Sequence, residues 1–228
     1  MKFKSQVYTQ VSGSIGGITY SHNQGGLYTR ARSIPVNPGS TFQVAVRALV
    51  SSLTNYWVNT LTPAQRAAWD LYAANVLLPD PFGDPRLVSG LNMFSRTNVP
   101  LLQAAGTQVN VAPGVFDLGS FTPPTIAAPN AAADTVDVSF NNADPWATAV
   151  GGHMLIYLSR PQNPSINFFK GPYRFAGKVS GAVVPPTSPA TITLPFPCVV
   201  GQRVFVKISF VQVDGRLSLP FRSFGTAV

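Results

Sequence analysis

The chain has 228 residues, of which 45% are hydrophobic and 11% aromatic, so it can bury a substantial core and is not a disordered tail. Only 11% of the residues are charged, against about 25% in an ordinary soluble domain, and the net charge is +8. A surface this poor in charge argues against a free monomer and favours extensive contact with other protein.

The charges are distributed unevenly. All eight acidic residues are Asp, the first is Asp70, and a second acid-free run lies between Asp144 and Asp214. Such an excess of positive charge favours an acidic partner or nucleic acid. The basic residues are scattered, without a run of Lys or Arg, so an acidic protein neighbour is favoured over DNA. The acid-free N-terminal region carries Lys2, Lys4, Arg30, Arg32, Arg47 and Arg66.

Cysteine content and hydropathy indicate the compartment. Cys198 is the single cysteine and lies in an apolar strand-like context, so we expect a buried, inert thiol. No stretch reaches the ~18 apolar residues of a membrane span, and the start, MKFKSQVYTQ, is too polar for a secretion signal. We therefore expect folding in a reducing cytoplasm, with no membrane partner.

Residues 1–39 are predicted to form an extended arm. Apolar residues from Val7 to Tyr20 alternate loosely with Ser, Thr and Gly, and the Asn-Gln-Gly-Gly sequence at 23–26 is a turn signal. Strands near Ile15–His22 and Leu27–Ser33 would then form a β-hairpin, which is marginally stable alone.

A helical region is predicted over 40–105. Ser40 and Gln43 form a capping box before a helix with apolar residues from Phe42 to Trp57 on one face. Thr62 and Gln65 form a second box, with Pro63 at the first position of a helix whose inward face includes Leu71 and which ends before Pro79. Trp57 and Trp69 are expected to pack between these two helices as structural core. A third helix is predicted from Ser89 to Gln103, interrupted near Pro100.

The rest of the chain is predicted to be a Gly-, Ala- and Pro-rich linker over 106–124, followed by strands over 125–228. The hydrophobic period changes to two, and a turn is expected at Asp214-Gly215. About seven short strands in this length favour an immunoglobulin-like or fibronectin type III-like β-sandwich, and the whole chain is predicted to be a multidomain α+β protein. The clearest strands are Thr135–Phe140, His153–Leu158, Tyr173–Val179, Ala190–Leu194, Arg203–Val213 and one ending near Phe224.

The glycine-rich stretch 12–17 does not fit a nucleotide-binding loop. Gly13, Gly16 and Gly17 do not reproduce G-x-G-x-x-G, and no Lys-Ser or Lys-Thr follows to bind phosphate and magnesium. We interpret these glycines as sites of bends or of close approach by another backbone, with Gly16 and Gly17 at a protein interface.

Residues that could support catalysis or metal binding are sparse. Neither His22 nor His153 has a second ligand nearby in the sequence. The carboxylate pairs Asp80/Asp84 and Asp134/Asp137 are more simply turn and strand-edge residues, and no G-x-S-x-G supports a nucleophile. The sequence therefore predicts no enzyme, no cofactor and no metal site.

The best candidate contact strip is YTRAR at 28–32. As a strand it places Tyr28, Arg30 and Arg32 on one side, where they would meet an acidic protein groove or DNA. Tyr20 on the preceding strand is a further candidate interface residue. Phe205, Phe210, Phe221 and Phe224 suit a sandwich interior or contacts.

Four spaced motifs in the N-terminal half carry a resemblance. They are S-G-x-x-G-G at Ser12–Gly17, N-x-x-G-x-Y-x-R at Asn23–Arg30, P-x-N-P at Pro35–Pro38 and L-T-x-x-Q-R-x-x-W at Leu61–Trp69, with SGLNMF at Ser89–Phe94 also similar. This half resembles a family of proteins encoded in tailed-bacteriophage genomes and prophages. The family has no established activity, so the resemblance implies a context and no chemistry.

In that context the expected function is structural. The leading hypothesis is a capsid decoration or cement protein, anchored by its N-terminal arm and helices to other virion proteins and forming a homo-oligomer within the particle. A neck or tail component is the alternative, and a nucleic-acid-binding protein is less favoured. The expected location is the virion, assembled in the host cytoplasm.

Overall fold

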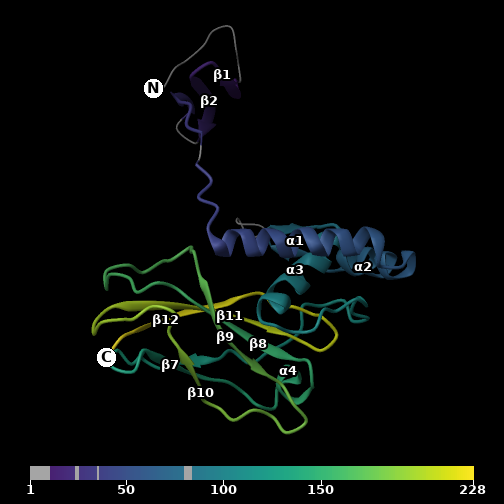
Figure 1. Ribbon diagram of the computed structural model, residues 1–228, viewed down its shortest axis with the longest axis vertical. Coiled ribbons are helices and arrows are strands. Elements are labelled where there is room, and N and C mark those ends of the chain that lie inside the picture. Colours follow the sequence, from purple (N-terminus) through teal and green to yellow (C-terminus); the bar gives the residue numbers. More distant parts are fainter. Residues whose placement is uncertain (1–10, 24–25, 35, 80–83) are drawn as a thin grey trace. The chain divides into compact units, whose positions relative to one another are not determined.

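The computed structural model describes residues 11–23, 26–34, 36–79 and 84–228. Expectations that concern residues 1–10, the centre of the turn at 24–25, Pro35 and Asp80 lie outside the described residues. The chain divides into an N-terminal unit, Met1–Thr41, and a main unit, Phe42–Val228. The predicted mixed α+β class is confirmed, with an N-terminal sheet, a helical segment and antiparallel sheets in the C-terminal half (Figure 1).

The N-terminal unit contains a three-stranded antiparallel sheet in the order β1-β2-β3. The predicted hairpin is present as β2 and β3, and a third strand, β1, which the sequence did not predict, pairs with β2. Gly16 has a φ of +57°, a conformation that glycine adopts without steric cost, so the Gly16-Gly17 turn folds β1 back on β2. The strands are β1 (Gly13–Ile15), β2 (Ile18–Asn23) and β3 (Gly26–Ala31).

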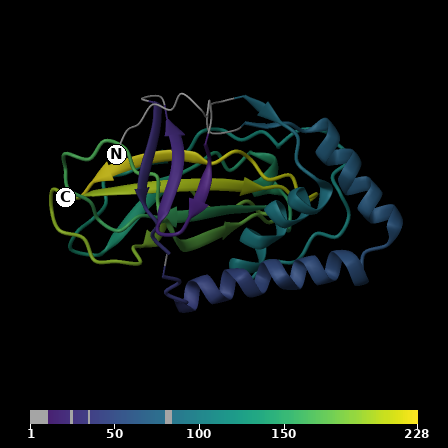
Figure 2. The same ribbon diagram turned by 90° about the horizontal axis from the view of Figure 1, so that it is seen from above.

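Three long helices begin the main unit: α1 (Thr41–Asn59), α2 (Pro63–Asn75) and α3 (Gly90–Gln103). In Figure 2, α1 and α2 follow each other around one end of the sheets. The predicted capping box of α2 is present, since the Gln65 amide donates to Thr62 Oγ1 and Gln65 Oε1 accepts from the Thr62 amide. The two-residue strands β4 (Leu78–Pro79) and β5 (Pro85–Arg86) pair between α2 and α3.

The predicted interruption of the third helix is wrong, because α3 continues through Pro100 to Gln103. Pro100 lies close to the C-terminal end, where its missing N–H removes a single helical hydrogen bond. Leu101 and Ala104 are buried against Leu155 and Val211 of the strands, and this packing holds the last turn in place.

A second core cluster lies among the helices. Trp69 is fully buried, and its ring meets Phe94 edge-on with the centroids 5.5 Å apart. Trp57 is partly buried and contacts the same phenylalanine at 5.6 Å. Leu71, predicted to face inward, is 56% exposed because it lies on the opposite side of α2 from Trp69 and Tyr72.

The segment 106–124 is irregular and hydrogen-bonded to the helices. Trp69 Nε1 donates to the Asn110 carbonyl at 3.1 Å, and the Tyr72 hydroxyl donates to the Asp117 carbonyl at 2.7 Å. The Asn98 side chain, fully buried in α3, both donates to and accepts from the backbone of Val109. These bonds satisfy polar groups that would otherwise be costly to bury.

Two antiparallel sheets follow, with strand orders β10-β7-β6 and β12-β11-β8-β9. Inward side chains from both sheets, such as Val136, Val138, Ile156 and Ile208, share one core with Trp146 of the short helix α4 (Pro145–Thr148). The strands are β6 (Thr125–Ile126), β7 (Thr135–Ser139), β8 (His153–Leu158), β9 (Arg174–Ser180), β10 (Ala190–Thr193), β11 (Arg203–Val211) and β12 (Phe221–Thr226).

Gly90 marks the closest approach of α3 to α2. A Cβ at this position would lie 2.3 Å from Asp70 Oδ1, 2.7 Å from the Asp70 amide nitrogen and 2.9 Å from the Trp69 carbonyl carbon. Because helix backbone cannot move aside locally, we expect Gly90→Ala to lower the free energy of unfolding by at least about 1–3 kcal/mol. Chemical denaturation would measure the loss. Gly114→Ala is the control, since no atom lies within 4 Å of its Cβ position, and an equal loss there would contradict the packing argument.

Candidate functional site: two exposed surfaces

The N-terminal sheet has two chemically different faces. The registers Ile15↔Ile18, Ile18↔Ala31, Gly13↔Tyr20 and Tyr20↔Thr29 put the apolar side chains on one face. We call this the apolar arm face; its apolar members are Ile15, Ile18, Tyr20, Leu27 and Ala31, and the register also places His22 and Thr29 on it. The opposite face carries Ser14, Thr19, Ser21, Tyr28 and Arg30.

The predicted interface residues divide between these faces. Tyr28 and Arg30 share the polar face, as the alternation predicted, and the amide of Arg32 donates to the Gly17 carbonyl at 2.8 Å just beyond β3. Tyr20 lies on the apolar arm face instead. Neither Gly16 nor Gly17 has a described atom within 4 Å of its Cβ position, so within this chain Gly16 serves the turn.

The apolar arm face has little cover of its own. Ile15 is 78% exposed and Ile18 46% exposed, and none of the described side chains from Val11 to Thr41 is buried. A three-stranded sheet gains independent stability by burying an apolar face. The described residues of the N-terminal unit leave most of this face exposed.

The second surface lies on the outer face of the four-stranded sheet. Helix α3 covers the half of this face around Leu155 and Val211. The other half alternates aromatic and basic side chains, because Phe205 lies opposite Phe224 and Lys207 lies opposite both Arg222 and Tyr157. We define the basic–aromatic face as Phe168, Phe169, Tyr173, Arg203, Phe205, Lys207, Arg222 and Phe224.

The cations of this face rest on aromatic rings. Lys207 Nζ lies 4.5 Å from the Tyr157 ring centroid and 5.8 Å from that of Tyr173, and the guanidinium of Arg203 lies 4.8 Å above Phe224. Burial, together with the positive charge of Arg222, lowers the pKa of Lys207. Arg203 also donates to the Ile166 carbonyl at 3.0 Å and to Asn167 Oδ1, which fixes its position.

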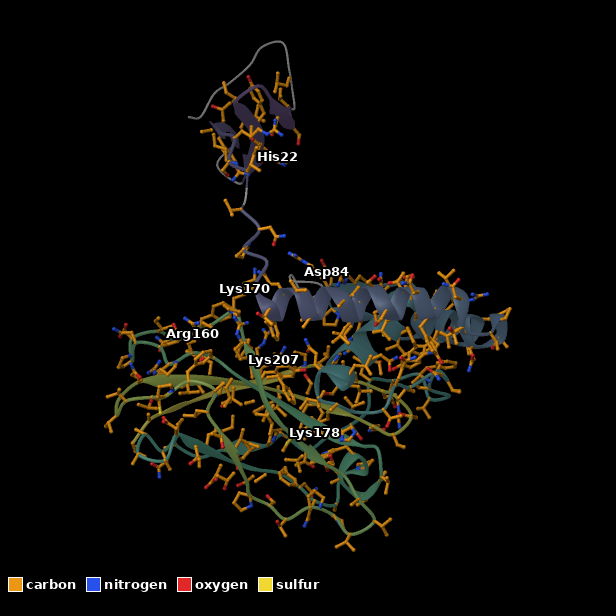
Figure 3. All side chains as sticks on the ribbon, in the orientation of Figure 1. His22, Asp84, Arg160, Lys170, Lys178 and Lys207 are labelled. Carbon is orange, nitrogen blue, oxygen red and sulfur yellow. The ribbon has the colours of Figure 1, made fainter. Side chains whose placement is uncertain are left out.

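Other cations lie on β9 and in the loop before it. Figure 3 labels Arg160 and Lys170 in the loop between β8 and β9, Lys207 on β11 and Lys178 on β9. In the described part of the chain, none of these forms an ion pair, whereas Arg216 pairs with Asp117 and Asp214. The positive charge of this half of the protein is therefore not neutralised from within.

Sequence reasoning missed this second surface. Phe205 and Phe224 were expected in a sandwich interior or at contacts, and the register places both on the outer face, while Phe210 and Phe221 pack inward. The available signal was the pair of patterns Phe205-x-Lys207 and Arg222-x-Phe224. Strand periodicity puts the members of each pattern on one face, but it does not say which face is buried.

The other residues considered as candidates in the sequence make ordinary structural contacts. His153 starts β8, its Nδ1 lies 3.2 Å from Ser180 Oγ, and burial and the nearby Lys178 lower its pKa. Cys198 is buried as predicted. Asp134 accepts from the Cys198 amide, and Asp137 accepts from the Thr191 hydroxyl. Among the described residues, no three His, Cys, Asp or Glu side chains lie together in a way that could hold a metal ion.

No helix in the described ranges is both long and apolar enough to cross a bilayer. Neither a known protein family nor any curated protein matches this chain.

Proposed function

We propose that the protein is a non-enzymatic structural component of a tailed-bacteriophage virion, most specifically a capsid decoration protein attached through its N-terminal unit. The observation that carries the proposal is the apolar arm face, an amphipathic sheet whose described strands leave Ile15 and Ile18 exposed. The motif resemblance of the N-terminal half to phage-encoded proteins supplies the biological context.

The attachment combines two kinds of contact. The apolar arm face packs on a neighbouring virion subunit, because burying apolar side chains is the dominant favourable term in most protein association. On the other face, Arg30 meets acidic groups of that neighbour, together with Arg32 just beyond β3. The low overall charge fits a chain whose surface is largely covered in an assembly.

The projecting part is an immunoglobulin-like or fibronectin type III-like sandwich in this proposal. If β6 to β12 are lettered A, B, C, C′, E, F and G, the sheets read A-B-E and C′-C-F-G. That division between two antiparallel sheets is typical of such sandwiches, and the core shared by both sheets supports it. Such domains serve many functions, so the sandwich supports a projecting module and no particular chemistry.

Quantitative mass spectrometry of purified phage particles tests the function and its location. A decoration protein is expected in hundreds of copies per particle, because a capsid repeats its subunits over a closed symmetric shell. A count of about six to twelve would instead place the protein in the neck or tail, the alternative structural role. Absence from purified particles would refute both.

The charges of Arg30 and Arg32 give a second test of the attachment. Replacing Arg30 and Arg32 with Ala is expected to weaken binding to particles, and the difference from the unmodified protein is expected to shrink as salt screens the charges. Co-sedimentation with particles at increasing ionic strength measures both effects. A loss that is independent of salt would show that the arginines contribute by packing and not by charge.

A further inference from the structure

We propose that the basic–aromatic face binds single-stranded nucleic acid, with one base held among its aromatic side chains and the phosphates held by the surrounding cations. The proposal is independent of how the N-terminal unit attaches. It rests on a depression of suitable shape, on an unneutralised group of cations and on the contacts that most described acidic side chains already make within the chain.

The depression lies where the β8–β9 loop meets β11 and β12. It is an open hollow of about 190 Å³, and a cavity of roughly 150 Å³ is enough to hold a benzene molecule. Phe168, 74% exposed, and Phe224, 45% exposed, present ring surface there. Base–aromatic stacking is sequence-tolerant because every base has a π-face, so the hollow suits a nucleobase of any identity. Its lining is Asn167, Phe168, Phe169, Tyr173, Phe205, Arg222, Ser223 and Phe224.

The floor of the hollow is rigid. Phe169 stacks on Phe205 with centroids 5.5 Å apart and the planes inclined by 23°, and Phe205 contacts Phe224 at 5.6 Å. The Tyr173 hydroxyl donates to the Phe169 carbonyl at 3.1 Å, which ties the loop to the start of β9. A preformed hollow requires little ordering when a ligand enters, and this favours binding.

Two cations beside the hollow repel each other, and a bound anion would reduce this repulsion. Lys207 and Arg222 lie directly opposite each other on β11 and β12, and like charges in that relation destabilise a sheet. No described acidic residue forms an ion pair with either of them. A phosphate between the two side chains would remove this repulsion. Arg222 lies opposite Lys207 and also lines the hollow, so the phosphate site and the base site would be adjacent.

A second copy of this chain is a poor source of the anion. Most of its described acidic side chains already form contacts within their own chain. These contacts are ion pairs with Arg216 or hydrogen bonds to backbone and hydroxyl groups. These engaged residues are Asp70, Asp117, Asp134, Asp137, Asp144 and Asp214. An acidic peptide could pair with the cations but would need an aromatic or apolar side chain at a matching position to cover the exposed rings of Phe168 and Phe224, whereas every nucleotide carries both a phosphate and a base. Single-stranded nucleic acid satisfies both features.

Fluorescence anisotropy on the full-length protein tests the proposal. The probe is a labelled oligothymidylate about 12 nucleotides long, within the span of known single-strand sites, and the comparison ligands are a duplex and an oligoglutamate of similar length. We expect the single strand to bind most tightly. Equal or tighter binding of the oligoglutamate would overturn the proposal in favour of an acidic protein partner, and equal binding of the duplex would overturn the assignment of the hollow to a base.

Two variants separate the ring contribution from the charge contribution. Phe168→Ala, which removes an exposed ring, is expected to weaken oligothymidylate binding about 5- to 150-fold. Arg222→Ala is expected to reduce the slope of log affinity against log salt by about 0.7. Arg86→Ala is the matched control, because Arg86 is an exposed arginine on β5 and its loss changes the net charge equally. Unchanged binding by Phe168→Ala, or an equal slope change in the control, would refute the proposed site.

Discussion

Replacing Trp69 with Ala is expected to lower the free energy of unfolding by about 3–5 kcal/mol, the usual cost of removing a large buried ring. Trp69 is 0% exposed and contacts the rings of both Phe94 and Tyr72. Its indole nitrogen also donates to the Asn110 carbonyl, so the variant loses a hydrogen bond to the segment that follows α3. Urea denaturation followed by circular dichroism would measure the change.

Leu71 provides the control on the same helix. Its side chain is 56% exposed, so Leu71→Ala is expected to change the free energy of unfolding by no more than about 0.5 kcal/mol. Trp57, partly buried against Phe94, is expected to fall between the two. A Trp69 variant as stable as the Leu71 variant would contradict the helical core described above.

The helix starts and most strands could be predicted because their signals are local. Thr62, Pro63 and Gln65 specify the start of α2 through backbone and side-chain hydrogen bonds within one turn. Strand β8 was predicted at its observed bounds because its apolar run is bounded by glycines and by the Ser-Arg-Pro sequence. Such signals need no knowledge of distant contacts.

The incorrect predictions concern features that depend on contacts between residues far apart in the sequence or on very short elements. Leu71 was predicted inward because it fits an apolar stripe on α2, but the side that packs on α3 is set by Trp69, Tyr72 and Ala73. Pro100 was predicted to break a helix whose last turn is held by packing on the sheet. Strand β1 was missed because three residues beside a Gly-Gly turn carry little periodicity.

The two candidate surfaces differ in the same way: one follows from a local pattern and the other from contacts between distant segments. The shared face of Tyr28 and Arg30 follows from strand periodicity alone. The basic–aromatic face depends on which side of β11 and β12 meets the other sheet, and on the β8–β9 loop folding back beside them. Neither is encoded within one short stretch of sequence, so this surface could not be predicted before the register was known.

Placing polar groups on the apolar arm face is expected to have the largest effect on assembly. In the double variant Ile15→Asn and Ile18→Asn, two side chains that lie opposite each other in the register lose their apolar surface. Full burial of an exposed isoleucine contributes about 1.5–3 kcal/mol, and Ile15 and Ile18 are 78% and 46% exposed, so the pair would contribute about 2–4 kcal/mol to binding the neighbour. Incorporation into particles is therefore expected to fall at least about thirtyfold, as measured by quantitative mass spectrometry of particles from cells that supply only the variant.

The control places the same substitutions on the opposite face of the same strands. Ser14 and Ser21 lie on β1 and β2 with side chains on the polar face, so Ser14→Asn with Ser21→Asn adds the same amide groups without touching the apolar arm face. We expect this variant to be incorporated normally. Hydrogen exchange adds an independent measurement, since amides of β1 to β3 are expected to exchange more slowly in particles than in free protein if the neighbour stabilises the sheet. Normal incorporation of the isoleucine variant, or equal protection in free and assembled protein, would mean that the N-terminal sheet is stable by itself and that another surface makes the attachment.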